Sequence, residues 1–241
     1  LTILFFVIFV FGCSSSSIIE HYDHVLSKNG MVRYEYDQGD FGVAYFLKET
    51  LDKRNETIHI YIEGDGRAWL NKFSISDNPT PFNSVVVKMA LDDTNHNVAI
   101  IGRPCQYFNL YRDGWCNNEY WSYSRYSDEV VNAISEVIDE ILQKLEGEKQ
   151  VGLIGFSGGG TIASLVAPRR DDVSWLITVA ANLDHKLWTE IHGVTPLTNS
   201  MNLLEVTDQL EAVPQVHYVG SNDTVVPKDV VLSLVDKYDT I

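Results

Sequence analysis

Val151-Gly152-Leu153-Ile154-Gly155-Phe156-Ser157-Gly158-Gly159-Gly160-Thr161 places a short apolar run directly before a series of small residues. The apolar run predicts a buried strand, and the small residues predict a tight turn into a helix. Ser157 is the centre of a Gly-x-Ser-x-Gly pattern, in which Gly155 and Gly159 leave room for a serine raised on that turn. We therefore expect Ser157 to be a nucleophile. The amide of Gly158, at the helix start, would face the oxygen of an attacked carbonyl group.

A glycine-rich turn after a strand has other interpretations. A phosphate-binding loop needs Gly-Lys followed by Ser or Thr, which is absent, and a dinucleotide-binding turn needs Gly-x-Gly-x-x-Gly, which Phe156 and Ser157 interrupt. An ordinary turn is the remaining alternative. The apolar run 175–181, which follows a helix-length spacer, favours a strand–helix–strand unit around Ser157.

Apolar runs of strand length alternate with helical segments along most of the chain. The other predicted strands lie at 58–62, 97–102 and 216–220, and helices are predicted at 81–92 and from Ser127 onwards. The second helix has an apolar stripe formed by Val130, Ile134, Val137, Ile138, Ile141, Leu142 and Leu145. This alternation predicts an α/β fold, a mostly parallel sheet with helices on both faces.

Two further segments flank this pattern. Residues 31–36 and 41–46 surround a Gly-Asp turn, which predicts an N-terminal antiparallel hairpin. Residues 182–210 are long and polar for a connection, and they predict either a cap over the site or a surface loop with one helix. We expect one catalytic domain over residues 31–241.

Acidic residues outnumber basic ones, 33 to 18, and the net charge is −15. Such a balance argues against nucleic acid as a partner and against electrostatic adhesion to anionic lipid. The seven histidines show no metal-binding spacing of the His-Glu-x-x-His kind, so neither a metal nor a cofactor is expected.

The N-terminal segment predicts export. Residues 1–12 form an apolar run of signal-peptide length, and Val10-Phe11-Gly12-Cys13 resembles a bacterial lipobox, although Phe11 is bulkier than usual there. We expect lipidation at Cys13, a tether over residues 13–30, and a place in the bacterial envelope facing the periplasm. The serine after Cys13 favours the outer membrane. The alternatives are a plain secretory signal or a buried strand.

Cys105 and Cys116 lie in one aromatic, turn-rich segment. We expect a disulfide between them, worth about 3 kcal/mol or slightly less for so short a loop, with two free thiols as the alternative. No zinc ligand set surrounds them.

The order of elements and the serine turn resemble the α/β-hydrolase superfamily. Residues 60–66 resemble its oxyanion loop, which implies a second amide donor at Asp65 or Gly66. An acid at Asp65 would be unfavourable there unless its side chain points away or pairs with Arg67. Residues 219–227 resemble the loop that carries the acid of the catalytic triad, which implies that role for Asp223; the alternatives are an Asx turn and Asp184 as the acid.

More narrowly, four segments resemble a group of uncharacterised bacterial, lipoprotein-like hydrolases: residues 61–66, Arg103-Pro104-Cys105-Gln106-Tyr107, Tyr120-Trp121 and Asn182-Leu183-Asp184. In the superfamily the base histidine follows the acid, and no histidine follows Asp223. The resemblance therefore implies a truncated C-terminus and a base beyond Ile241. Within the chain, His217 fits a packed strand residue, while His185 and His192 would need an unusual arrangement.

These features together predict a serine hydrolase that cleaves small-molecule or lipid carboxylic esters through an acyl-enzyme on Ser157. Two alternatives remain open. One is a non-catalytic envelope protein that uses the fold for binding, and the other is a peptidase or acyltransferase of the same fold.

Overall fold

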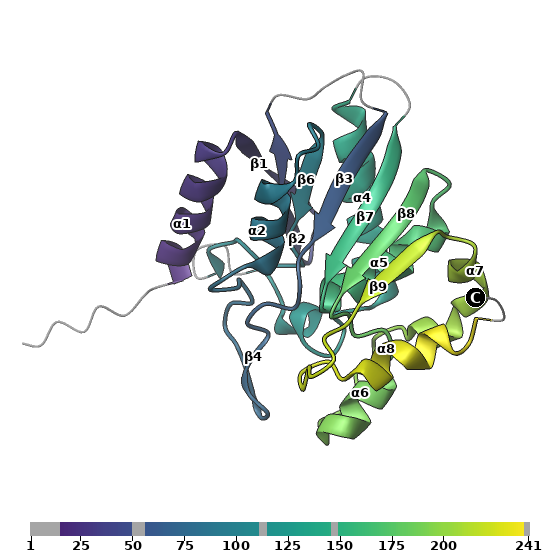
Figure 1. Cartoon of the computed structure of the whole chain (residues 1–241). Helices are drawn as coiled ribbons and strands as arrows, with labels where there is room; N and C mark the ends of the chain where they lie inside the picture. Colours follow the sequence, from purple (N-terminus) through teal and green to yellow (C-terminus); the bar gives the residue numbers. More distant parts are fainter. Residues whose placement is uncertain (1–14, 50–55, 111–114, 146–148, 239–241) are drawn as a thin grey trace, which may run out of the picture.

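The computed structural model describes residues 15–49, 56–110, 115–145 and 149–238. A seven-stranded sheet runs through the molecule in the order β1-β2-β6-β3-β7-β8-β9 (Figure 1). Its strands are β1 (Met31–Asp37), β2 (Gly42–Lys48), β3 (Thr57–Ile62), β6 (Val98–Ile101), β7 (Gln150–Phe156), β8 (Val173–Val179) and β9 (Gln215–Tyr218). The strands from β6 to β9 are parallel, whereas β1, β2 and β6 pair in antiparallel fashion. The predicted α/β fold and its N-terminal hairpin are confirmed.

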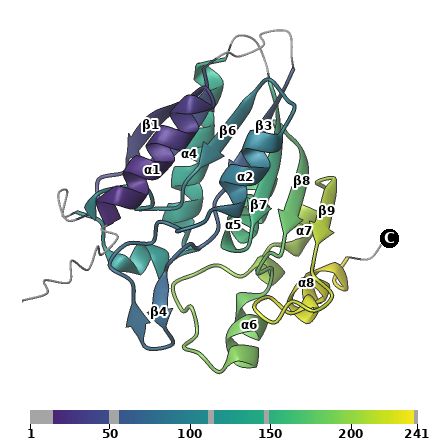
Figure 2. The ribbon, with the colours of Figure 1, turned by 60° about the vertical axis from the view of Figure 1, so that its left-hand side comes forward.

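Helices cover both faces of the sheet. On one face, α4 (Asp128–Gln143) and α5 (Gly158–Val166) pack on the side chains of β3 and β7, and α8 (Lys228–Val235) joins this cluster. On the other face, α1 (Ser15–Lys28) and α2 (Val85–Asp92) pack on β2 and β6 (Figures 1 and 2). Ser127 caps α4 as predicted, accepting a hydrogen bond from the Val130 amide at 3.3 Å. The apolar stripe of α4 faces the sheet, and its members are buried except for Leu142, which is half-buried; Leu145 is buried just beyond the end of the helix.

The N-terminal segment departs from the expectation of a tether. Residues Ser15–Lys28 form a helix in which Ile19, Tyr22 and Leu26 are buried, and Tyr22 and Leu26 belong to the cluster formed with α2 and the sheet. The tether prediction over 13–30 is therefore wrong from Ser15 onwards, because a side chain every three or four residues finds apolar cover. The folded domain begins before residue 31. Cys13 and the predicted signal peptide lie outside the described residues.

Smaller differences occur at the ends of elements. Helix α2 begins at Val85 rather than at residue 81, because Ser84 occupies the cap position and accepts from the Val87 amide at 2.8 Å. A short hairpin of β4 (Trp69–Asn71) and β5 (Ser74–Ile75) was not expected. Residues 182–210 include α6 (His185–His192) and the short helix η3 (Leu203–Glu205), and α7 (Thr207–Glu211) follows. In the described part of the chain, no helix has both the length and the apolar character needed to cross a membrane.

Candidate functional site

Ser157 lies between the end of β7 and the start of α5, in a sparsely populated backbone conformation with φ 52° and ψ −125°. The flanking glycines are required sterically. A Cβ atom at Gly155 would lie 2.4 Å from the Gly159 carbonyl oxygen, and one at Gly159 would lie 2.3 Å from that of Ile62. The predicted strand–turn–helix is confirmed, and it holds Ser157 in the kind of strained geometry that clusters at active sites. Among the described residues, none forms a hydrogen bond with Ser157 Oγ.

The loop after β3 lies beside Ser157. A Cβ atom at Gly64 would be 3.4 Å from Ser157 Cβ, so the backbone of this loop approaches the serine closely. Asp65 follows Gly64 directly, so its amide is the next one along the chain from the point of close approach, while that of Gly66 is one residue further. Gly66 has φ 60°, and a Cβ atom there would meet the Pro79 carbonyl oxygen at 2.1 Å. Of the two predicted donors, the geometry favours Asp65, while Gly66 permits the tight turn.

The carboxylate of Asp65 is held by two buried arginines. Arg125 Nη1 lies 2.7 Å from Asp65 Oδ2, and Arg103 Nη1 lies 3.1 Å from Oδ1. Burial raises the pKa of Asp65, but the two guanidinium charges outweigh this effect and the pKa is lowered. The expected alternative partner, Arg67, instead stacks over the Phe82 ring at 3.8 Å. The acid in the oxyanion loop is thus neutralised, although not by the residue suggested from sequence.

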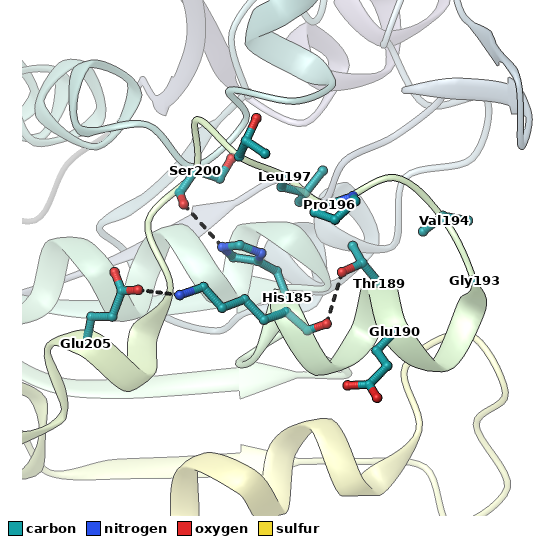
Figure 3. A pocket seen from close by; sticks show the side chains of 11 residues that line it. His185, Thr189, Glu190, Gly193, Val194, Pro196, Leu197, Ser200 and Glu205 are labelled. Atoms are coloured by element: carbon teal, nitrogen blue, oxygen red, sulfur yellow. Dashed lines mark hydrogen bonds and ion pairs between the residues drawn. The ribbon is translucent and has the colours of Figure 1, made fainter.

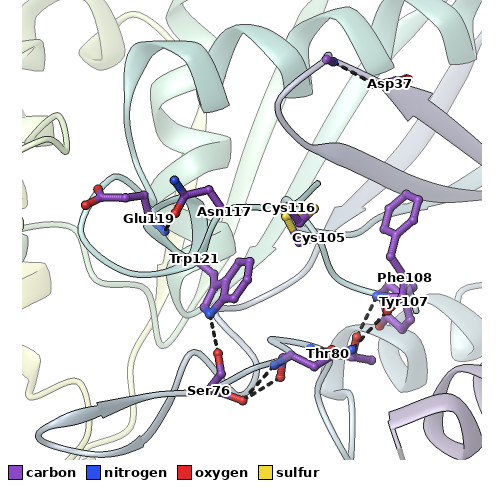
Figure 4. The surroundings of a disulfide bond; sticks show 12 residues. Asp37, Ser76, Thr80, Cys105, Tyr107, Phe108, Cys116, Asn117, Glu119 and Trp121 are labelled. Carbon is purple, nitrogen blue, oxygen red and sulfur yellow. Dashed lines mark hydrogen bonds between the residues drawn. A yellow bond between two sulfur atoms is a disulfide. The ribbon is translucent and has the colours of Figure 1, made fainter. Parts of the chain in front are cut away.

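The segment Arg103–Tyr107 anchors this loop at three successive residues. Besides the Arg103 contact with Asp65, Gln106 Nε2 donates to the Gly64 carbonyl at 2.9 Å, and the Tyr107 hydroxyl donates to Glu63 at 2.5 Å. Cys105 lies between these anchors and forms the predicted disulfide with Cys116 (Figure 4). The segment that sequence analysis singled out only by resemblance therefore positions the oxyanion loop.

Glu63 is fully buried at the end of β3. Its carboxylate accepts hydrogen bonds from the hydroxyls of Ser84 and Tyr107. Burial raises the pKa of Glu63, and these two hydrogen bonds offset the effect only in part. The oxyanion loop is thus bordered by two acids of opposite behaviour, Glu63 with a raised pKa and Asp65 with a lowered one.

Asp223 follows β9 at the same edge of the sheet. Its Oδ1 accepts hydrogen bonds from the Val225 and Val226 amides at 2.8 and 3.0 Å, which is the Asx turn considered as the alternative. Within the described residues, Oδ2 has no hydrogen bond. The turn therefore leaves one oxygen available to orient a histidine. Asp184 instead caps α6, accepting from the Lys186 and Leu187 amides and from Asn202.

Among the described residues, no histidine lines the cavity into which Ser157 opens. His217 hydrogen-bonds with Thr178 and Gln215 within the sheet, as expected for a packed strand residue. His185 donates from Nε2 to the Ser200 carbonyl and lines a cavity of about 600 Å³ between α6 and the loop that follows it, to which Ser157 does not contribute (Figure 3). His192 donates to the Val225 carbonyl. Within the described ranges, no group of three His, Cys, Asp or Glu side chains is placed to hold a metal ion.

Ser157 opens into a cavity of about 530 Å³. The oxyanion loop forms one wall, and Trp69, Arg125, Trp188 and Val225 line its other end. Trp188 belongs to α6, so the segment 182–210 does contribute a wall to the site. Trp69 comes from the unexpected hairpin, which sequence reasoning missed because its strands have only three and two residues.

Solved structures with the same fold include esterases and a serine hydrolase homologue, all at low sequence identity. The Pyrococcus furiosus esterase Pf2001 is 14% identical with a TM-score of 0.58, over 88% of this chain and 79% of that one. Est1E from Butyrivibrio proteoclasticus is 12% identical with a TM-score of 0.56, over 86% and 85%. An alpha-beta serine hydrolase homologue from Coxiella burnetii is 17% identical with a TM-score of 0.56, over 87% and 83%. At these identities the likeness establishes the fold alone.

A search of curated protein sequences finds no match for the chain. The sequence model of the serine hydrolase family FSH1 matches residues 109–241, which is more than half of the chain and includes both Ser157 and Asp223. The chain therefore belongs to the FSH1 family of serine hydrolases.

Proposed function

We propose that the protein hydrolyses carboxylic esters through an acyl-enzyme on Ser157. The observation that supports this most directly is the approach of the Gly64 backbone to Ser157 Cβ at the floor of an open cavity. We infer that the Asp65 amide, which follows Gly64, and the Gly158 amide, at the N-terminus of α5, are the donors on the two sides of the serine hydroxyl. Two donors in such positions suit the oxyanion of a tetrahedral intermediate.

In the proposed mechanism, Ser157 Oγ attacks the ester carbonyl carbon and its proton passes to a histidine. The developing oxyanion accepts hydrogen bonds from the Asp65 and Gly158 amides, and the leaving alcohol takes the proton from the histidine. Water then cleaves the acyl-enzyme. Asp223 Oδ2 would hold the histidine in its productive tautomer. We propose that this histidine lies beyond Ile241, following the residue order of the superfamily.

The lowered pKa of Asp65 fits this proposal. A carboxyl group that exchanged protons beside the oxyanion would weaken the stabilisation of the oxyanion. The Asp65 carboxylate is instead bound by Arg103 and Arg125, which keep it ionised. Together the three groups carry one net positive charge, and the Asp65 carboxylate is the one of them that lies against Gly158, where a Cβ atom would be 2.0 Å from its Oδ1. A positive charge that is already in place lowers the free energy of the negative intermediate.

A fluorophosphonate probe tests the nucleophile. We expect the full-length protein to form a covalent adduct on Ser157, located by mass spectrometry, and Ser157→Ala to lose both the adduct and ester hydrolysis while remaining folded. Ser164→Ala is the matched control, because Ser164 lies in the same helix with its hydroxyl buried on the Gly160 carbonyl. A folded full-length protein without an adduct would favour the binding-protein alternative. Hydrolysis of amides but not esters would favour the peptidase alternative.

We further propose that Cys13 carries a lipid that anchors the protein in the bacterial envelope. The support is the apolar run followed by the lipobox-like sequence that ends at Cys13. The intact mass of the membrane-fractionated protein tests this proposal. A mass without an acyl modification, together with a protein found wholly in the aqueous fraction, would refute it.

A further inference from the structure

A second cavity of about 350 Å³ continues from the Ser157 cavity. The two cavities share Trp69, Arg125, Trp188 and Val225 as lining residues, so they meet at these side chains. Beyond the junction, the second cavity is lined by the aliphatic side chains of Val194 and Leu197 and by five polar residues: Asn71, Lys72, His192, Thr195 and Thr224. A molecule with its carbonyl group at Ser157 can therefore extend into this space.

Three donor atoms at the junction already have partners. Trp188 Nε1 donates to the Val225 carbonyl at 2.7 Å, which turns the indole ring rather than its N–H group to the cavity. Arg125 donates to the Ser122 carbonyl from Nε and to Asp65 from Nη1.

Among the polar lining residues, Asn71 accepts from the Phe73 amide, Lys72 donates to the His192 carbonyl and His192 donates to the Val225 carbonyl. The space therefore presents two indole rings and aliphatic side chains, with Thr195 and Thr224 as the further polar side chains. Such a lining favours a hydrocarbon group over a charged or sugar-like one.

The two walls of this cavity come from elements far apart in the chain. The β4–β5 hairpin supplies Trp69, and α6 with the loop after it supplies Trp188, Val194 and Leu197. Figure 2 shows the hairpin and α6 beyond the carboxyl ends of the parallel strands. A hydrogen bond from Lys72 Nζ to the His192 carbonyl, 3.1 Å long, links the walls.

Exposed apolar side chains stand on both walls. Phe73, at the tip of the hairpin, is 92% exposed, and Leu70 and Ile191 are also exposed. None of these three side chains lines either cavity, so the argument for the ligand rests on the lining alone.

We propose that this cavity binds a medium-length hydrocarbon chain of the ester substrate. The inference rests on the proposed ester hydrolysis at Ser157. A volume of about 350 Å³ is at the small end of ligand cavities, which suits a chain of intermediate length and excludes a long fatty chain held entirely inside. The hydrocarbon chain can belong to the acyl part or to the alcohol part of the ester. In either case the carbonyl carbon of the ester can lie at Ser157.

Two series of esters distinguish these sources in the full-length protein. The first varies the acyl group on a constant alcohol, with p-nitrophenyl acetate, butyrate, octanoate and palmitate. The second varies the alcohol on a constant acetyl group, with methyl, butyl and octyl acetate. In one of the two series, we expect kcat/KM to rise from the shortest member to the octyl or octanoyl ester.

Val194→Phe fills the cavity with a larger side chain, and Val216→Phe is its matched control. Val216 is 48% exposed on β9 and lines neither cavity. We expect Val194→Phe to lower kcat/KM by about tenfold or more for the octyl-length ester of the responding series and by less than about twofold for the shortest ester. Leu197→Ala, which enlarges the cavity, should shift the optimum to a longer chain. Val216→Phe should leave both values unchanged.

Labelling with an ethyl fluorophosphonate separates the two ways of failing. If Val194→Phe is labelled at Ser157 and hydrolyses the shortest esters, but its chain-length profile equals that of the wild type, the cavity assignment is overturned and ester hydrolysis stands. If the wild-type protein neither hydrolyses any ester nor becomes labelled, the proposed function and the cavity assignment fall together.

Discussion

At the residue scale, the pairing of Asp65 with two arginines makes a stability prediction. The Arg103 and Arg125 side chains are 3% and 6% exposed, so removal of their shared carboxylate leaves two buried positive charges without a counter-charge. We expect Asp65→Ala to lower the free energy of unfolding by about 3–5 kcal/mol, as measured by urea denaturation. Asp23→Ala is the control, because Asp23 pairs with Arg33 near the surface and should cost less than about 1 kcal/mol. Equal losses in the two variants would contradict the prediction.

Glu63 makes a pH prediction at the same scale. Its pKa is raised by burial, so the folded protein retains this proton at pH values where the unfolded chain has lost it. The stability contributed by Glu63 is therefore fully present below its ordinary pKa of 4.5 and is lost as the pH rises towards the folded value. Asp65 has a lowered pKa, so its contribution to stability changes with pH only below its ordinary pKa of 3.8. That pH range is separate from the range in which Glu63 acts.

The variant that tests this is Glu63→Gln, which keeps an acceptor oxygen for Ser84 and Tyr107 but cannot ionise. We expect its free energy of unfolding, relative to that of the wild type, to increase between about pH 5 and about pH 8 in urea titrations. A difference that stays constant over this range would mean that Glu63 ionises in the folded protein as readily as in the unfolded chain.

At the element scale, the segment Arg103–Tyr107 links the disulfide to the oxyanion loop. Cys105 and Cys116 are separated by 11 residues, and a bond that closes so short a loop contributes about 3 kcal/mol or slightly less in the chain-entropy model. We expect the double variant Cys105→Ser, Cys116→Ser to lose about this much free energy of unfolding. We also expect its kcat to fall by a larger factor than the factor by which KM changes. The reason is that Gln106 and Tyr107, which hold Gly64 and Glu63, follow Cys105 directly. An unchanged kcat in the folded double variant would show that the segment keeps its position without the disulfide.

The same elements show what the sequence could predict. The serine turn, the capped helix α4 and the disulfide depend on residues close together in the chain, and local patterns indicated all three correctly. The partners of Asp65 lie 38 and 60 residues away along the chain, so no local pattern identifies them. For helix α1 the prediction of a tether is wrong. Its serine-rich start is typical of a linker, whereas the spacing of three or four positions between its apolar residues indicates the helix.

At the scale of the whole molecule, helix α1 connects to the active-site loop through hydrogen bonds. The Tyr22 hydroxyl accepts from the Ser84 amide at 2.7 Å, and the Ser84 hydroxyl donates to Glu63, next to the Gly64 that contacts Ser157. The N-terminal helix thus supports the loop from the opposite face of the sheet to α5. The interaction also joins α1 to the cap position of α2.

Tyr22→Phe removes the acceptor and leaves the buried Ser84 amide without its partner. We expect the free energy of unfolding to fall by about 1–3 kcal/mol, which is the usual cost of an unsatisfied buried donor. Tyr36→Phe is the matched control, since the Tyr36 hydroxyl bonds to Glu136 at the surface and should cost less than about 1 kcal/mol. If the hydrogen bond also orients Ser84 and Glu63, kcat for short esters falls in Tyr22→Phe but not in Tyr36→Phe. Equal stability and equal kcat in both variants would show that α1 covers the sheet without supporting the oxyanion loop.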